Sequence, residues 1–218
     1  MATGRVIRPE ILDGLAADDP SAFRARLDLR WINVLMGNRR WVKHSLRRAL
    51  RHLPNAGAKT RFIEIGAGDG RLCRQILDWF PQASITGLDL APRPPGLPEA
   101  ISWRQGDLFE QLPNCIGDAL IAVMILHHFS DERLTALGRM LQRFKIVCLC
   151  ETWRVHFPHF LGALIRPFCG AVTRHDLPVS IDAGFLRGEL PRLLSLSNWQ
   201  VKESVDCRGA LRVLAWRE

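Results

Sequence analysis

The sequence has no apolar run long enough to form a membrane helix. Its longest wholly apolar stretch, Ala119 to Leu126, is far short of the roughly 20 residues that such a helix needs. The N-terminus also has no apolar stretch of the kind that forms a signal peptide. From these absences we expect a soluble protein that is not exported and stays in the cytoplasm.

Cysteine pairs of the C-x-x-C type are missing as well. The six cysteines are scattered singly or as one C-x-C, mostly among apolar neighbours, which predicts buried free thiols in a reducing compartment. His156-x-x-His159 resembles a metal pair, but Pro158 is expected to spoil a regular helix there, and no third ligand stands at a convincing position. The sequence therefore predicts no metal site.

The composition lacks the bias of disordered, collagen-like or coiled-coil chains, and no internal repeat is visible. With 218 residues, of which 47% are hydrophobic and 24% charged, the chain can bury one sizeable core but not two. We expect one domain with an appendage.

The positive charge belongs to one segment. From Arg24 to Arg51 there are nine arginines and lysines against the single acidic Asp28, so this segment carries the whole net charge of +8. A helix is expected to open at Asp19-Pro20 and to end at Gly37. Apolar residues then recur at three- and four-residue steps from Trp41 to Leu53, which predicts a second, amphipathic basic helix. We predict an N-terminal helical extension over residues 1–58 and a main domain over 59–218.

After this segment, short apolar strands alternate with helices, which is typical of an α/β protein with a parallel sheet. Strands are expected near 61–65, 84–90, 101–104, 119–126, 145–150, 199–205 and 210–216. Helices are expected near 70–80, 131–143 and 183–194, and the long segment 151–180 separates the fifth strand from the last of these helices.

A glycine-rich turn follows the first strand. Gly66, Gly68 and Gly70 are spaced G-x-G-x-G, and glycine lets a ligand lie close to the backbone at the carboxyl end of a strand. The dinucleotide fingerprint would need glycine or alanine where Arg71 stands. Glu64, two residues before the turn, would also face a cationic amine better than a pyrophosphate. NAD is therefore disfavoured.

Two further strands end in a carboxylate. Asp89 lies 19 residues past Gly70, close to the roughly 20 expected of a carboxylate that accepts ribose hydroxyls. Gly106-Asp107-Leu108 follows the next strand, where the aspartate could accept from an adenine amino group and the leucine could pack on its ring.

Together these motifs resemble those of class I S-adenosylmethionine-dependent methyltransferases of the small-molecule type, which act on quinone precursors and secondary metabolites. The fourth matching motif is Met124-Ile-Leu-His-His-Phe-Ser-Asp131, and the four are in the correct order between Arg61 and Glu151. The resemblance implies a Rossmann-like, seven-stranded, mostly parallel sheet with helices on both faces and the last strand antiparallel.

The resemblance also implies a cofactor, S-adenosyl-L-methionine, and residues that bind it. Glu64 would bind the methionine amine, Gly66 and Gly68 would form the turn, Asp89 would hold the ribose, and Asp107 with Leu108 would hold the adenine. Leu90 and Met124 are further cofactor-binding candidates. The reaction implied is methyl transfer to oxygen or activated carbon of a small molecule, and we expect the acceptor pocket in the segment 151–180, which follows the fifth strand.

His127 and His128 are the candidates for a general base. Adjacent strand residues point in opposite directions, so we expect at most one of them to face the pocket. His128 matches the histidine of the family's frequent L-E-H-V type segment. A histidine that caps or packs under the following helix is the alternative.

Two other functions stay open. The basic face between Arg24 and Arg51 could grip the phosphates of an RNA substrate, although the D-P-P-Y-like motif usual for nucleic-acid amino methylation is replaced by Met124-Ile125-Leu126-His127. Alternatively, a non-catalytic Rossmann-like domain could use the same helices, with Trp31 and Trp41, to dock on an anionic membrane or a protein.

Overall fold

The computed structural model describes residues 4–16, 18–52 and 60–217, and its centre is a seven-stranded sheet. The strands lie in the order β3-β2-β1-β4-β5-β7-β6, and β7 is antiparallel to both of its neighbours. Their bounds are β1 Arg61–Ile65, β2 Ser84–Asp89, β3 Ile101–Gln105, β4 Ala119–Val123, β5 Ile146–Thr152, β6 Gln200–Val205 and β7 Ala210–Trp216. The predicted Rossmann-like fold, including the antiparallel last strand, is confirmed.

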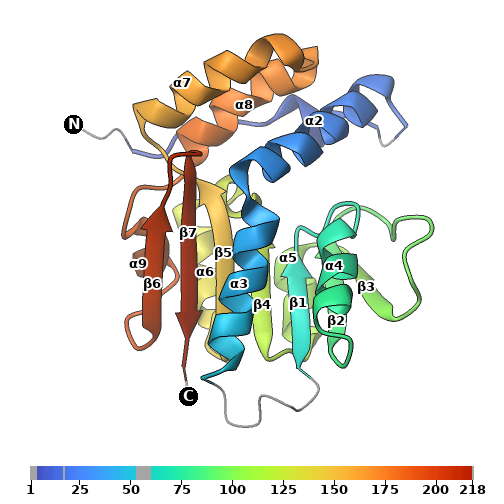
Figure 1. Cartoon of the computed structure of the whole chain (residues 1–218), viewed down its shortest axis with the longest axis vertical. Coiled ribbons are helices and arrows are strands. Elements are labelled where there is room, and N and C mark those ends of the chain that lie inside the picture. The colour runs from blue at the N-terminus through green and yellow to red at the C-terminus, as the bar shows by residue number, and fades with distance from the viewer. Residues whose placement is uncertain (1–3, 17, 53–59, 218) are drawn as a thin grey trace.

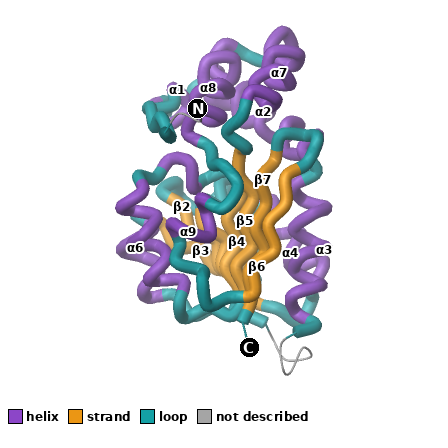
Figure 2. Tube along the Cα trace, turned by 90° about the vertical axis from the view of Figure 1, so that its left-hand side faces the viewer, coloured by secondary structure: helices purple, strands orange, loops and turns teal. Residues whose placement is uncertain are grey.

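Helices cover both faces of the sheet (Figure 2). One face carries α3 (Asn38–Leu50) and α4 (Arg71–Trp79); the other carries α6 (Asp131–Leu141) and α9 (Glu189–Leu193). Strand residues alternate between the two layers: Phe62 and Ile121 pack toward α3 and α4, whereas Ile63 and Leu120 pack on the opposite side. Because both faces are covered, the central strands are apolar almost throughout.

The first of the two predicted N-terminal helices begins and ends as the sequence predicts, and the second is present as α3. In α2 (Pro20–Met36), the Asp19 carboxylate accepts from the Ser21 backbone N–H, and Gly37 ends the helix in the left-handed conformation with φ 68°. The buried apolar face of α3 (Val42, Leu46, Ala49 and Leu50) packs on β5 and β7. Leu53 and the predicted domain boundary after residue 58 lie outside the described residues.

A helical cap lies over the carboxyl edge of the parallel strands (Figure 1). It consists of α1 (Ile11–Gly14), α2, α7 (His156–Ile165) and α8 (Ala171–Ala183), with the 3-10 turn η3 (Arg166–Phe168) between the last two. The buried Asp28 joins α2 to α8 because it accepts from the Gly170 N–H at 2.7 Å. Asp176 accepts the backbone N–H groups of Ile11 and Leu12 at the start of α1.

Three short elements complete the fold: α5 Leu108–Gln111, η1 Leu112–Asn114 and η2 Leu126–His128. No described helix has the length and apolar character needed to cross a membrane.

Two local predictions are wrong. Pro158 does not spoil a helix, because it occupies the third position of α7, where the first-turn N–H groups have no partner within the helix. The helix expected near 183–194 is shorter than predicted. α8 ends at Ala183, and α9 starts only after Gly188, whose left-handed φ of 80° is incompatible with a continuous helix.

Candidate active site

Gly66 and Gly68, both in the turn after β1, differ in the space beside them. Gly66 and Gly68 have positive φ values of 66° and 54°, a conformation that glycine adopts without strain. A Cβ on Gly66 would come within 2.7 Å of the Ile125 side chain, whereas a Cβ on Gly68 would meet nothing within 4 Å. Gly66 therefore allows close packing inside the turn, and Gly68 leaves free space beside it.

Asp89, at the end of β2, holds this turn in place. Its Oδ2 accepts from the Gly68 N–H at 2.7 Å, and its Oδ1 accepts from the Ala91 N–H at 2.9 Å. Leu90, which lies between Asp89 and Ala91 in the sequence, is 74% exposed. The structure thus brings three predicted residues together: Gly68, Asp89 and Leu90.

Glu64 lies buried beneath the turn, on β1. Its Oε2 accepts from the Cys73 thiol at 2.9 Å, and a thiol is only a weak donor. Burial raises the pKa of Glu64 to about 8, and the nearby charges of Asp69 and Asp89 add to the effect, while Cys73 opposes it. A cationic group placed beside this carboxyl would favour its ionised form.

The raised pKa of Glu64 predicts a pH-dependent stability. The folded chain takes up the proton more readily than the unfolded chain, so the stabilisation is complete below pH 4.5 and is lost as the pH rises toward about 8. Without ligand, the free energy of unfolding should therefore fall more steeply from pH 5 to pH 8 in the wild type than in Glu64→Gln. Urea unfolding at both pH values measures this, and equal slopes in the two proteins would contradict it.

Asp107 lies at the start of α5, with both carboxylate oxygens engaged. Oδ1 accepts from the Phe109 N–H and Oδ2 from Arg133 Nη2, each at 2.7 Å. Desolvation pushes the pKa of Asp107 up, but Arg133 and the backbone N–H groups outweigh it, so the pKa is lowered. Leu108 is buried in the core, and the Arg133 guanidinium lies 4.4 Å from the centre of the half-buried Phe109 ring.

Met124 forms a strained turn at the end of β4. Its φ of 57° is rare for a residue with a side chain, and its N–H donates to the Cys150 carbonyl at 2.8 Å. Its half-buried side chain packs against an apolar cluster that includes Ile32 and Met36 of α2. Such strain clusters at functional sites, and here it directs the chain into the histidine turn η2.

His127 is buried and held by Glu151 of β5. His127 Nδ1 lies 2.7 Å from Glu151 Oε2, while Glu151 Oε1 accepts from the Ile125 and Leu126 N–H groups at 2.9 and 2.7 Å. His127 Nε2 lies 3.5 Å from Glu10 Oε1. Burial would lower the pKa of His127, but the charges and hydrogen bonds of Glu151 and Glu10 outweigh it and raise the pKa to about 9.

His128, the predicted base, is a quarter exposed, and its ring is 4.3 Å from that of His127, centre to centre. Its Nδ1 lies 3.3 Å from Asp13 Oδ2. The hydrogen bond and charge of His128 lower the pKa of Asp13. Each histidine thus meets an acidic residue of the N-terminal segment.

The basic α2 helix approaches the site at two places. Arg30 pairs with Asp69 of the glycine turn at 3.0 Å, and Met124 packs against the apolar cluster that includes Ile32 and Met36. The Arg30–Asp69 pair is about a third exposed, so its own contribution is at most about 1 kcal/mol. The pair nevertheless holds α2 of the cap next to the glycine turn.

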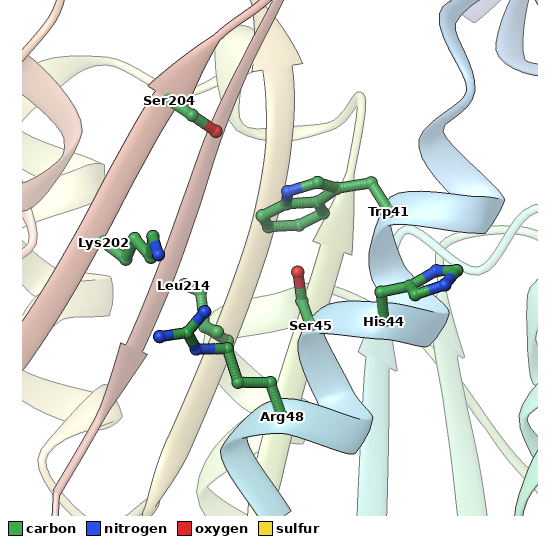
Figure 3. A pocket seen from close by; sticks show the side chains of 7 residues that line it. All are labelled: Trp41, His44, Ser45, Arg48, Lys202, Ser204 and Leu214. Carbon is green, nitrogen blue, oxygen red and sulfur yellow. The ribbon is translucent and has the colours of Figure 1, made fainter.

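A hollow of about 200 Å³ lies elsewhere, between α3 and the β6–β7 edge (Figure 3). It is lined by Trp41, His44, Ser45, Arg48, Lys202, Ser204 and Leu214. None of these is a predicted cofactor-binding or catalytic residue, so the hollow is separate from the candidate active site.

Sequence reasoning missed three residues of the site: Glu10, Glu151 and Arg133. Glu151 carried a usable signal, because it follows an apolar strand as Asp89 does. Glu10 carried none, since 117 residues separate it from His127. Arg133 belongs to an ordinary amphipathic helix and becomes notable only through its contact with Asp107.

The strand order and the carboxylates at the strand ends define the chain as a Rossmann-like protein of the methyltransferase fold. Human N-acetylserotonin methyltransferase in complex with SAM has a TM-score of 0.61 at 18% identity, covering 94% of this chain and 61% of that one. The plantazolicin methyltransferase BamL, in complex with a triazolic desmethylPZN analog and SAH, has a TM-score of 0.71 at 9% identity, covering 95% of this chain and 93% of that one.

The O-methyltransferase domain model matches residues 41–150, and the chain belongs to that family. Chavicol O-methyltransferase of Ocimum basilicum is 30% identical over 95 residues, 43% of this chain and 26% of that protein. Trans-resveratrol di-O-methyltransferase of Vitis vinifera is 33% identical over 72 residues, 32% and 20% respectively. The matched part thus spans about a quarter or less of these relatives.

Proposed function

We propose that this chain is an S-adenosylmethionine-dependent methyltransferase that acts on a small-molecule acceptor at oxygen or activated carbon. The observation that carries the proposal is the free space beside Gly68, next to Asp89 and above the buried Glu64. The chain that forms it is a member of the O-methyltransferase domain family. The family favours oxygen over carbon.

The chain offers groups that fit each part of this cofactor. The buried Glu64 carboxyl, whose side-chain partner is a thiol, suits the methionine amine, and the half-buried Asp89 suits the ribose hydroxyls. The open space beside Gly68 lets the ligand approach the backbone. The full proposed binding set is Glu64, Gly66, Gly68, Asp89, Leu90, Asp107, Leu108 and Met124, with Phe109 beside Asp107.

The chemistry on the protein's side is alignment and proton removal. When bound, the cofactor would supply the methyl group as an electrophile on a positively charged sulfur, and the acceptor hydroxyl would have to lose its proton to a base of the protein. We place the acceptor hydroxyl at the His127–His128 pair, with His128 as the candidate base. Glu151 fixes the orientation of His127.

A methyl-transfer assay tests this function. Protein incubated with methyl-labelled S-adenosylmethionine and a panel of phenols should give a singly methylated product, and His128→Ala should lower kcat more than it weakens S-adenosylhomocysteine binding. Transfer to RNA but to no small molecule would contradict the acceptor class.

The basic segment supports a small-molecule acceptor over RNA, because part of its charge is used within the fold. Arg24 pairs with Asp28, Arg30 with Asp69, and Arg39 donates to Gln75. Arg47 and Arg48, in contrast, are exposed on α3.

These two arginines could contact an anionic membrane at its surface. Such a contact would suit an enzyme whose acceptor is lipophilic.

We also place the enzyme in a reducing compartment such as the cytoplasm. Of the six cysteines, all of which are unpaired, five are buried and Cys207 is exposed. An exposed thiol of this kind persists where disulfides do not form.

A further inference from the structure

The hollow between α3 and the β6–β7 edge is positively charged, and none of its lining residues is acidic. Arg48 of α3 and Lys202 of β6 extend into it from opposite walls (Figure 3). Neither side chain has an ion-pair partner in the part of the chain that the structure describes. Two cations that face the same space repel each other, so an anion placed between them would be stabilised.

A buried hydroxyl also points into the hollow. Ser45 of α3 is only 7% exposed, and its hydroxyl is directed into the hollow in Figure 3. This hydroxyl makes no hydrogen bond to any group within residues 4–16, 18–52 and 60–217. Since burial without a hydrogen-bond partner is unfavourable for a hydroxyl, Ser45 is a donor ready for a ligand. Ser204, on the β6 wall, offers a second hydroxyl.

The remaining wall of the hollow is apolar and flat. The half-buried indole of Trp41 extends into the hollow, and Leu214 of β7 lines it as well (Figure 3). The Arg212 guanidinium lies 5.7 Å from the centre of the Trp41 ring, a cation–π contact that helps to hold the ring. The charge of Arg212 is already paired with Asp206 at 2.7 Å, so it does not compete for an anion in the hollow.

The size of the hollow limits the ligand to a single ring. Its volume is about 200 Å³, whereas drug-sized ligands occupy pockets of about 300–1,000 Å³. A cavity of about 150 Å³ is large enough to hold benzene. One aromatic ring with a charged group therefore fits the space, and a dinucleotide does not.

We propose that this hollow binds a small aromatic anion, of the aryl phosphate or aryl carboxylate class. Arg48 and Lys202 would hold the anionic group by charge, the Ser45 and Ser204 hydroxyls would donate to its oxygens, and the ring would pack on Trp41. None of these residues belongs to the glycine turn or the histidine turn, so the proposal does not depend on methyl transfer.

Titration calorimetry with phenyl phosphate tests the proposal on the full chain. At about 0.15 M salt, we expect one saturable site per chain with a Kd of about 1 mM or lower. The double variant Arg48→Gln/Lys202→Gln should raise this Kd about 10-fold or more, because both charges on the anion are lost. Inorganic phosphate lacks the ring and benzyl alcohol lacks the charge, so each should bind about 10-fold more weakly than phenyl phosphate.

The matched control is Arg40→Gln/Arg47→Gln, which makes the same change in net charge at two exposed positions of α3 outside the hollow. Its Kd should stay within about 2-fold of the wild type, because exposed charges outside the site are largely screened at this salt concentration. Ser45→Ala should weaken binding about 3-fold or more without lowering the temperature of unfolding, because the hydroxyl it removes has no partner in the fold. Thermal unfolding of every variant confirms that it is folded.

Three results would overturn the proposal: no saturable binding of phenyl phosphate, the same Kd for Arg48→Gln/Lys202→Gln as for the wild type, or inorganic phosphate binding as tightly as phenyl phosphate. Saturation with S-adenosylhomocysteine should leave the Kd of phenyl phosphate unchanged. Competition between the two ligands would place the anion in the cofactor site and reject the hollow. Failure of S-adenosylhomocysteine to bind, with phenyl phosphate binding intact, would reject only the methyltransferase function.

Discussion

Glu151→Ala should lower the free energy of unfolding by about 3 kcal/mol or more, since each buried donor left without an acceptor costs about 1–3 kcal/mol. The Glu151 carboxylate accepts from the Ile125 and Leu126 N–H groups and bonds to the His127 ring, and it is completely buried. Alanine removes all three interactions and leaves a cavity. Urea unfolding at constant pH measures the loss.

Glu99→Ala is the matched control, because Glu99 is exposed in the connector before β3. It should change the free energy of unfolding by no more than about 0.5 kcal/mol. Glu151→Gln should fall between the two, because its amide oxygen still accepts from the backbone. If Glu151→Ala proved as stable as the control, Glu151 would not organise the histidine turn.

Asp89→Ala should weaken S-adenosylhomocysteine binding about 100-fold or more. A hydrogen bond to a charged group contributes about 1.5–3 kcal/mol, and two ribose hydroxyls would lose such a partner. The substitution also frees the Gly68 and Ala91 N–H groups that Asp89 now holds at 2.7 and 2.9 Å. Titration calorimetry measures the change in Kd.

Two further variants separate these effects. Asp78→Ala, at an exposed position of α4, should leave the Kd unchanged. Asp89→Asn keeps an oxygen for the Gly68 N–H but loses the charge, so its Kd should lie between those of the wild type and Asp89→Ala. Equal Kd values for wild type and Asp89→Ala would show that the ribose is held elsewhere.

The sheet could be predicted because its signals are local. The strand β4 is wholly apolar, and both faces of the sheet are covered, so burial and pattern agree. The boundaries of α2 follow from Asp19, Pro20 and Gly37, each with a direct effect on its own backbone. Proline disrupts a helix only beyond its first turn, so the effect of Pro158 depends on where α7 begins, and the local sequence does not specify that start.

The candidate site was only half predictable. The spacing from Gly70 to Asp89 follows from one strand–turn–helix–strand unit, so it is visible in the sequence. The contact of Glu10 with His127 depends on how the N-terminal segment docks on α8, through bonds such as those of Asp176 to Ile11 and Leu12. Nothing in the local sequence specifies that docking.

The basic segment shows the same limit. Its charge suggested an external partner, but Arg30 reaches Asp69 of the glycine turn and α3 packs on the sheet. Charge counts do not show which side chains are paired within the fold, and this becomes visible only when the helices are placed.

The binding of S-adenosylmethionine and S-adenosylhomocysteine to the wild-type chain, measured by calorimetry, tests the central claim most directly. The structure predicts saturable binding of both ligands at one site, weakened by Asp89→Ala and unaffected by Asp78→Ala. If the folded wild-type protein bound neither ligand, the open turn between Gly68 and Asp89 would not be a cofactor site and the proposed function would be wrong.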